Sequence, residues 1–96
     1  MNTPQSGVEV RHNRAEGRFE VEVDGLLSVA DYTLSDGRMT FTHTFVPDAL
    51  RGRGLAEKLV RAGLAHAQAE RLTVVPACSY VATFIQRHAE FQALLG

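Results

Sequence analysis

The stretch that decides the fold is Val46-Pro47-Asp48-Ala49-Leu50-Arg51-Gly52-Arg53-Gly54-Leu55-Ala56, in the middle of a 96-residue chain. Pro47 has no amide hydrogen for a β-ladder, so it predicts the end of a strand. Apolar residues at helical spacing after Gly54 predict that a helix follows. Free amides at that helix start, two glycines and two arginines favour a site for an anion such as a pyrophosphate. A glycine-containing helix start with solvated arginines remains the alternative.

The commoner phosphate-binding motifs do not fit this stretch. No Lys-Ser or Lys-Thr pair follows Gly54, which excludes a P-loop. The Gly-x-Gly spacing continues with an alanine, and the flanking strands do not predict a strand–helix–strand unit. A dinucleotide-binding fingerprint is therefore excluded as well.

The residues before the stretch predict an antiparallel meander. Residues 18–23 alternate apolar and charged side chains, which predicts a strand with its charges on one face. Asp24-Gly25 and Ser35-Asp36-Gly37 predict tight turns on either side of a returning strand over 26–34. Residues 8–12 predict a further short strand at the beginning.

The last strand of the meander covers residues 38–46. Its alternation predicts that Met39, Phe41, His43 and Phe45 share one face. If that face belongs to the core, His43 is a hydrogen-bonded structural histidine. If the face lines a cleft, His43 is a candidate base.

The residues after the stretch predict two helices with a strand between them. The first helix begins near Leu55, residues 72–75 form a short buried strand before Pro76, and the second helix covers about 79–88 with Ser79 as its N-cap. The order ββββαβα predicts an α+β fold, with two main helices on a mostly antiparallel sheet. We expect a single domain over 1–96, with a flexible segment at residues 1–6.

Composition narrows the functional classes. A net charge of −1 argues against a nucleic-acid-binding protein, which needs a basic face. The single cysteine excludes a disulfide framework and a Cys-x-x-Cys zinc site, and the scattered histidines predict no metal. Residues 1–6 lack the basic region and apolar run expected of a signal peptide, and no apolar run approaches the ~18 residues of a membrane span. We therefore expect a cytoplasmic monomer or small oligomer.

Arg51-Gly52-Arg53-Gly54-Leu55-Ala56 resembles the Q/R-x-x-G-x-G/A signature of the GNAT acetyltransferase superfamily. Residues 42–47 and the segment Val75-Pro76-Ala77-Cys78-Ser79-Tyr80-Val81 resemble its small single-domain members, so the resemblance covers nearly the whole chain. It implies a minimal GNAT-like fold with acetyl-CoA as co-substrate. The implied contacts to the pantetheine arm and acetyl carbonyl are Thr44, Phe45 and Val46, and the implied contacts to the pyrophosphate are Arg51, Gly52, Arg53, Gly54, Leu55 and Ala56.

The resemblance also implies two residues near the reacting thioester. Tyr80 is the candidate acid that protonates the departing CoA thiolate, although packing against Phe84 is an equal alternative. Cys78 is a candidate nucleophile for a covalent route, although a small buried side chain or a contact to the CoA thiol region is the simpler interpretation. Direct transfer to an amine is the other route.

Three functions follow from these observations. The first is transfer of the acetyl group from acetyl-CoA to an unidentified amine, on a small molecule or a protein. The alternative is a non-catalytic acyl-CoA-binding module, because the chain lacks the helical segment that shapes the acceptor site in larger members of the superfamily. The third is an interaction domain whose arginines meet another anion such as nucleic acid, which the net charge disfavours.

Overall fold

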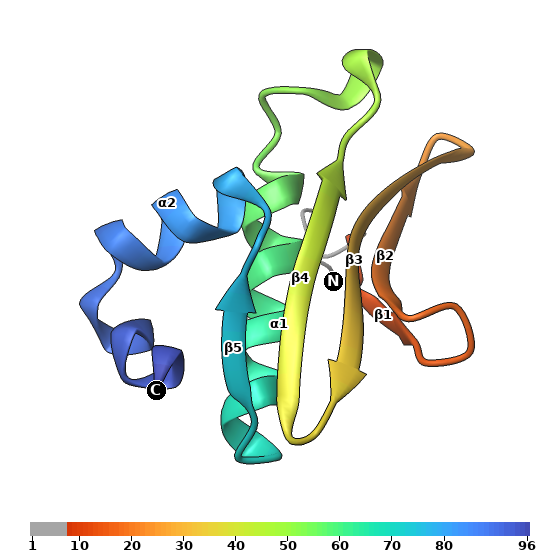
Figure 1. Ribbon diagram of the computed structural model, residues 1–96. Coiled ribbons are helices and arrows are strands. Elements are labelled where there is room, and N and C mark those ends of the chain that lie inside the picture. The colour runs from red at the N-terminus through yellow and green to blue at the C-terminus, as the bar shows by residue number, and fades with distance from the viewer. Residues whose placement is uncertain (1–7) are drawn as a thin grey trace, which may run out of the picture.

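The computed structural model describes residues 8–96, and the segment expected to be flexible, 1–6, lies outside them. The predicted α+β order is confirmed, with short 3₁₀ segments added before the first helix and after the second (Figure 1). The elements are β1 (Arg11–Asn13), β2 (Arg18–Val23), β3 (Leu26–Ser35), β4 (Arg38–Phe45), η2 (Asp48–Leu50), α1 (Leu55–Ala69), β5 (Thr73–Pro76), α2 (Ser79–Arg87) and η3 (Ala89–Leu95).

The five strands form one sheet in the order β1-β2-β3-β4-β5. Successive strands from β1 to β4 are antiparallel, as the tight turns predict, whereas β5 pairs with β4 in parallel. A parallel pair needs a long crossover connection, and α1 supplies it, so the prediction that the flanking strands do not form a strand–helix–strand unit is wrong. Figure 1 shows α1 behind the sheet, with α2 and η3 beyond its β5 edge.

The core lies between α1 and the face of the sheet that α1 covers. Gly63 of α1 permits the closest approach, because a Cβ at this position would lie 2.7 Å from Cε1 of Phe41. Apolar side chains at alternate strand positions and at helical spacing on α1 fill the layer. They include Phe19, Val21, Ala30, Tyr32, Met39, Phe41, Leu55, Leu59, Val60, Leu64 and Ala67.

The other face of the sheet is more polar, yet it holds one buried charge. Glu20 lies on the face opposite Phe19 and Val21, as the alternation predicts, but it is only 5% exposed. Its carboxylate accepts hydrogen bonds from Arg11 (3.0 Å), Arg18 (2.7 Å) and Asn13 (2.9 Å). Three donors from β1 and β2 therefore compensate the burial of this carboxylate.

A β-bulge divides β4 into two parts. Phe41 lies opposite Tyr32 and His43 lies opposite Asp31, so Thr42 is an extra residue on the β4 side. Before the bulge, β4 points its apolar side chains into the core. After the bulge the alternation is inverted, and both His43 and Phe45 are exposed. The prediction that they share a face with the buried residues before the bulge is therefore wrong, and so is a core role for His43.

The element boundaries differ slightly from the sequence-based ones. β1 occupies residues 11–13 rather than 8–12. α2 begins at Ser79 itself, with Cys78 as the N-cap residue, so the prediction of Ser79 as N-cap is wrong. α1 begins at Leu55, and Gly54 precedes it in the left-handed conformation (φ +74°).

Candidate functional site

The site lies where β4 and β5 separate. Their pairing ends at Phe41 opposite Pro76, and the amide of Cys78 donates a last hydrogen bond to the Phe41 carbonyl (2.8 Å). The chain then turns away into α2, whereas β4 continues to Phe45. In the part of the chain that the structure describes, this end of β4 has a strand partner on the β3 side only. The backbone groups of its other edge are therefore available to a ligand.

The loop between β4 and α1 depends on two glycines with positive φ. Gly52 has φ +85° and Gly54 has φ +74°, a region that other residues enter at a cost. A Cβ built on either glycine meets no atom within 4 Å, so both border open space. The first hydrogen bond of α1 runs from the Lys58 amide to the Gly54 carbonyl (3.2 Å). The amides of Leu55, Ala56 and Glu57 precede this bond and have no carbonyl of an earlier turn to pair with, so they are available to a ligand such as an anion.

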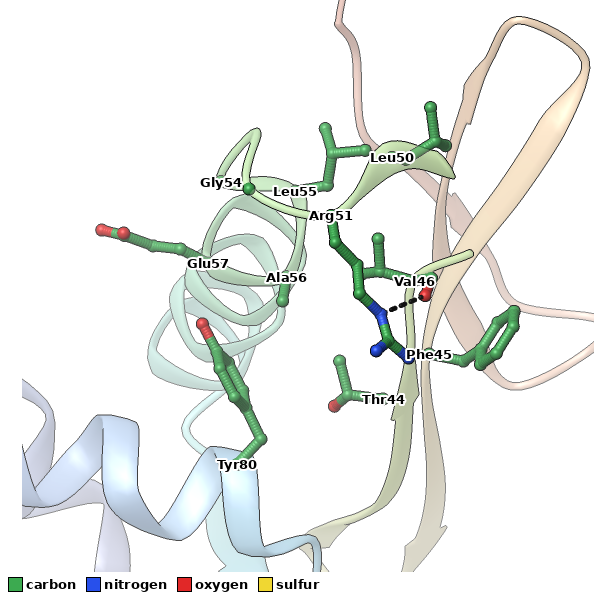
Figure 2. Close-up of a pocket in the computed structure, with 11 residues that line it drawn as sticks. Thr44, Phe45, Val46, Leu50, Arg51, Gly54, Leu55, Ala56, Glu57 and Tyr80 are labelled. Atoms are coloured by element: carbon green, nitrogen blue, oxygen red, sulfur yellow. Dashed lines mark hydrogen bonds between the residues drawn. The ribbon is translucent and has the colours of Figure 1, made fainter. Parts of the chain in front are cut away.

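A pocket of about 420 Å³ occupies the space between the two helix starts and the end of β4. Figure 2 shows Thr44 of β4 and Tyr80 of α2 on opposite walls, with the first turn of α1 between them. Leu50 and Glu57 also line the pocket and were not predicted as site residues. They immediately flank residues 51–56, which were. The lining residues predicted from the sequence are Thr44, Phe45, Val46, Arg51, Gly52, Gly54, Leu55, Ala56 and Tyr80.

The two arginines of the loop differ in position. Arg51 lies in the pocket wall, where its Nε donates to the Val46 carbonyl (3.4 Å; Figure 2) and its Nη2 lies 3.2 Å from the Asp48 carboxylate. Arg53 is absent from the pocket lining. Its Nη1 lies 3.8 Å from the carboxylate of Asp24, at the turn between β2 and β3. The structure therefore places one of the two predicted phosphate-binding arginines at the pocket and the other outside it.

Cys78 lies half-buried next to the pocket wall. Its Sγ is 3.5 Å from Oγ1 of Thr44, which itself lines the pocket. Burial raises the pKa of the thiol, but hydrogen bonds from the Thr44 hydroxyl and from the Val81 and Tyr80 amides lower it by more. The pKa of Cys78 therefore lies below its usual value, because the Thr44 hydroxyl and the amides at the beginning of α2 stabilise the thiolate.

Tyr80 presents its phenol to the pocket and is 40% exposed. Partial burial raises the pKa of Tyr80, and the nearby negative charge of Glu57 raises it further. The hydroxyl therefore stays protonated at neutral pH and can act as a proton donor. Its ring also lies near that of Phe84, at 6.4 Å between centroids.

His43 lies on the exposed side of β4, beyond the bulge. Its ring stacks on Phe45 with 6.4 Å between centroids and an interplanar angle of 15°. Asp31 is its neighbour across the β3–β4 ladder. His43 is thus available to a molecule that approaches the end of β4 from the face opposite α1.

Together, the separated parallel strands, the glycine-containing helix start and the pocket between them define a small α+β protein with an open pocket at the end of its parallel strand pair. The chain belongs to the GCN5-related N-acetyl-transferase family, whose model matches residues 18–94. It is 32% identical over 91 residues to Protein NATD1 of Xenopus tropicalis (88% of this chain, 81% of the relative). It is likewise 32% identical over 84 residues to Protein NATD1 of Homo sapiens (84% and 74%). An NMR structure of a GCN5-like protein from Staphylococcus aureus superposes with a TM-score of 0.74 and 26% identity (93% of this chain, 88% of the other).

No helix within residues 8–96 combines the length and apolar character of a membrane span. No three His, Cys, Asp or Glu side chains among these residues form a potential metal-binding group.

Proposed function

We propose that the protein binds acetyl-CoA in the pocket between β4, α1 and α2 and transfers the acetyl group to an amine. The observation that supports this most directly is the coincidence of three features around one pocket. These are the anion-binding start of α1, the unpaired edge of β4 and the protonated phenol of Tyr80. Membership of the GCN5-related N-acetyl-transferase family supports the same proposal.

The pyrophosphate of CoA would lie at the loop before α1. The positive φ of Gly52 and Gly54 leaves backbone amides accessible there, and Arg51 lies on the same wall. The pantetheine arm would then follow the unpaired edge of β4 at Thr44 to Val46, where backbone groups can pair with its amides as a neighbouring strand would. In this binding mode the thioester would lie near the side chains of Thr44 and Tyr80.

In direct transfer, the amine nitrogen attacks the thioester carbonyl carbon. The C–S bond then breaks, and the CoA thiolate takes a proton from the Tyr80 hydroxyl. A backbone amide of β4 would stabilise the negative charge on the carbonyl oxygen. His43 does not line the pocket but lies on the open face of β4 beside Asp31, and it would be the candidate to accept the proton that the amine loses.

In the covalent route, the Cys78 thiolate attacks the carbonyl carbon first, and CoA leaves before the amine arrives. The lowered pKa of Cys78 supports this route, because more of the thiol is ionised at neutral pH. Its half-buried position behind Thr44 favours direct transfer instead. Both routes begin with the same acetyl-CoA complex.

A non-catalytic acyl-CoA-binding module is the second candidate. One observation favours it: within residues 8–96, no helix covers the face of β2, β3 and β4 opposite α1 (Figure 1). On this face, an acceptor molecule would therefore contact the strands of the sheet and no covering helix of these residues. Such a module would bind CoA with the same contacts and would not transfer the acetyl group to any amine.

Kinetics of two variants test the catalytic proposal. We expect Tyr80→Phe to reduce kcat about 10²-fold with the Kd for CoA nearly unchanged, because only the proton donor is removed. Tyr32→Phe is the matched control, since the Tyr32 hydroxyl contacts His12 (2.6 Å) and neither residue lines the pocket. Full activity of Tyr80→Phe would show that the Tyr80 hydroxyl is not the proton donor to the CoA thiolate. Absence of acetyl transfer by the unmodified protein to a broad amine panel, with CoA still bound, would favour the binding module.

A further inference from the structure

A second, smaller hollow of about 160 Å³ adjoins the pocket. Glu57 of α1 and Tyr80 of α2 line both spaces, so one ligand can occupy the two together (Figure 2 shows these two side chains). The hollow lies between the start of α1 and the outer face of α2. Its other lining residues, all from α2 or the residue that follows it, are Thr83, Phe84, Arg87 and His88.

Two basic side chains border this hollow. Arg87 is exposed at the last turn of α2, and within residues 8–96 no carboxylate lies within 4 Å of it, unlike Arg51, Arg53 and Arg61. The ring of His88 stacks on Phe84 at 4.0 Å between centroids. Its Nδ1 lies 2.8 Å from the Phe84 carbonyl and donates to that oxygen, which leaves Nε2 for another partner.

The carboxylate in the hollow does not cancel the positive charge of Arg87. Glu57 accepts a hydrogen bond from Nε of Arg61 at 2.9 Å, so its charge is already paired. The Arg61 guanidinium is fixed over the ring of Phe84 and lies 3.9 Å from Glu90. Arg87 therefore contributes positive charge that no side chain of residues 8–96 neutralises.

Building on the proposed function, we infer that this hollow receives the 3′-phosphate on the ribose of CoA, with Arg87 and His88 as its partners. Glu57 lies in the first turn of α1 and lines both spaces, so a pyrophosphate bound at the start of α1 would have the hollow within reach of the adjoining adenosine end of CoA. The 3′-phosphate is a monoester with close to two negative charges at neutral pH. An arginine without a carboxylate partner is the side chain best suited to it. The hollow would thus make the protein selective for CoA over 3′-dephospho-CoA.

Calorimetric titration with CoA and with 3′-dephospho-CoA tests this inference. We expect the unmodified protein to bind CoA about tenfold more tightly, the effect of one charge-assisted contact. Arg87→Gln should reduce that ratio to about twofold or less by weakening CoA alone. Arg38→Gln, an exposed arginine at the start of β4, is the matched control and should leave the ratio unchanged. Thermal melting of each variant establishes that it is folded.

Each outcome of these titrations supports or overturns the inference that the hollow binds the 3′-phosphate. Equal affinity of the unmodified protein for the two ligands would overturn the inference while leaving the proposed function intact. A tenfold preference that survives in Arg87→Gln would remove Arg87 as the phosphate partner. Failure of both ligands to bind would overturn the proposed function together with the inference. A preference lost in Arg87→Gln and kept in Arg38→Gln would establish it.

Discussion

The two ends of β4 differ in how completely their neighbours surround them. Before the bulge, β4 pairs with β3 on one side and with β5 on the other, and Met39 and Phe41 are fully buried against α1. After the bulge, β4 pairs with β3 only, and Phe45 is 46% exposed. One strand therefore serves both as the centre of the core and as the wall of the pocket. Changes in the first part should alter stability, and changes around the second should alter ligand affinity.

The largest expected effect is on the buried part. Gly63→Val should destabilise the fold by about 3 kcal/mol, because its Cβ would meet the Phe41 ring at 2.7 Å in a filled core. For a domain of this size, that loss lowers Tm by more than 10 °C. Ala65→Val, on the exposed side of the same helix, is the control and should change Tm by only a few degrees. Equal Tm values for the two variants would contradict this description of the core.

The second prediction concerns the open part. Gly54→Val should weaken CoA binding at least tenfold, because its side chain would fill the space before α1. Gly37→Val is closely matched: Gly37 has φ +76° against +74° for Gly54, and a Cβ on either glycine meets nothing within 4 Å. Both variants should lose about 1–2 kcal/mol of stability from backbone strain. Titration of both with CoA should show weakened binding for Gly54→Val only, and equal affinities would place the pyrophosphate elsewhere.

The third prediction concerns how stability depends on pH through Glu20, the buried carboxylate of β2. Hydrogen bonds from Arg18 and Asn13 hold the pKa of Glu20 below its usual value despite its burial. The ionised carboxylate therefore adds stability above its unfolded-state pKa, and that stability is lost as pH falls through the lower folded-state pKa. Glu20→Gln should be less stable by about 1 kcal/mol at pH 7. Urea unfolding at pH 7 and pH 3 should show this difference shrinking at pH 3; a constant difference would refute it.

The smallest expected effect links the two parts. Asp24→Asn removes the partner that holds Arg53 away from the pocket, so CoA should bind about twofold more tightly, the scale of an exposed ion pair. Asp36→Asn is the control, since Asp36 occupies an equivalent turn with φ +52° against +54°. A change in CoA affinity for the control as large as for Asp24→Asn would show that Arg53 is not involved.

Most of the fold could be predicted from the sequence because its signals are local. Strict alternation, two aspartate–glycine turns and Pro47 define the meander, and helical spacing after Gly54 defines α1. The bulge at Thr42 could not be predicted, because alternation of residue types continues unbroken through His43 and Phe45. The burial of Glu20 was missed for a similar reason: its three donors come from two strands and meet only in the folded sheet.

The site was predicted as a segment of the chain but not as a geometry. Residues 51–56 indicate the loop, yet only the fold brings Tyr80 of α2 to the wall opposite Thr44. Arg53 has the residue type expected of a phosphate ligand and instead pairs with Asp24, which is 29 positions away in the sequence (53 − 24). The contact between Cys78 and Thr44 likewise depends on how β4 and β5 separate. Side-chain contacts between segments far apart in the sequence could therefore not be predicted.

The most direct test of the acetyl-CoA site is calorimetric titration of the purified protein with acetyl-CoA and, separately, with CoA, followed by intact-mass measurement. We predict micromolar binding of both ligands at one site per chain. A persistent added acetyl group that disappears in Cys78→Ala would assign the covalent route, and an unchanged mass would assign direct transfer or a binding module. No binding of either ligand by the folded protein would contradict the proposed site.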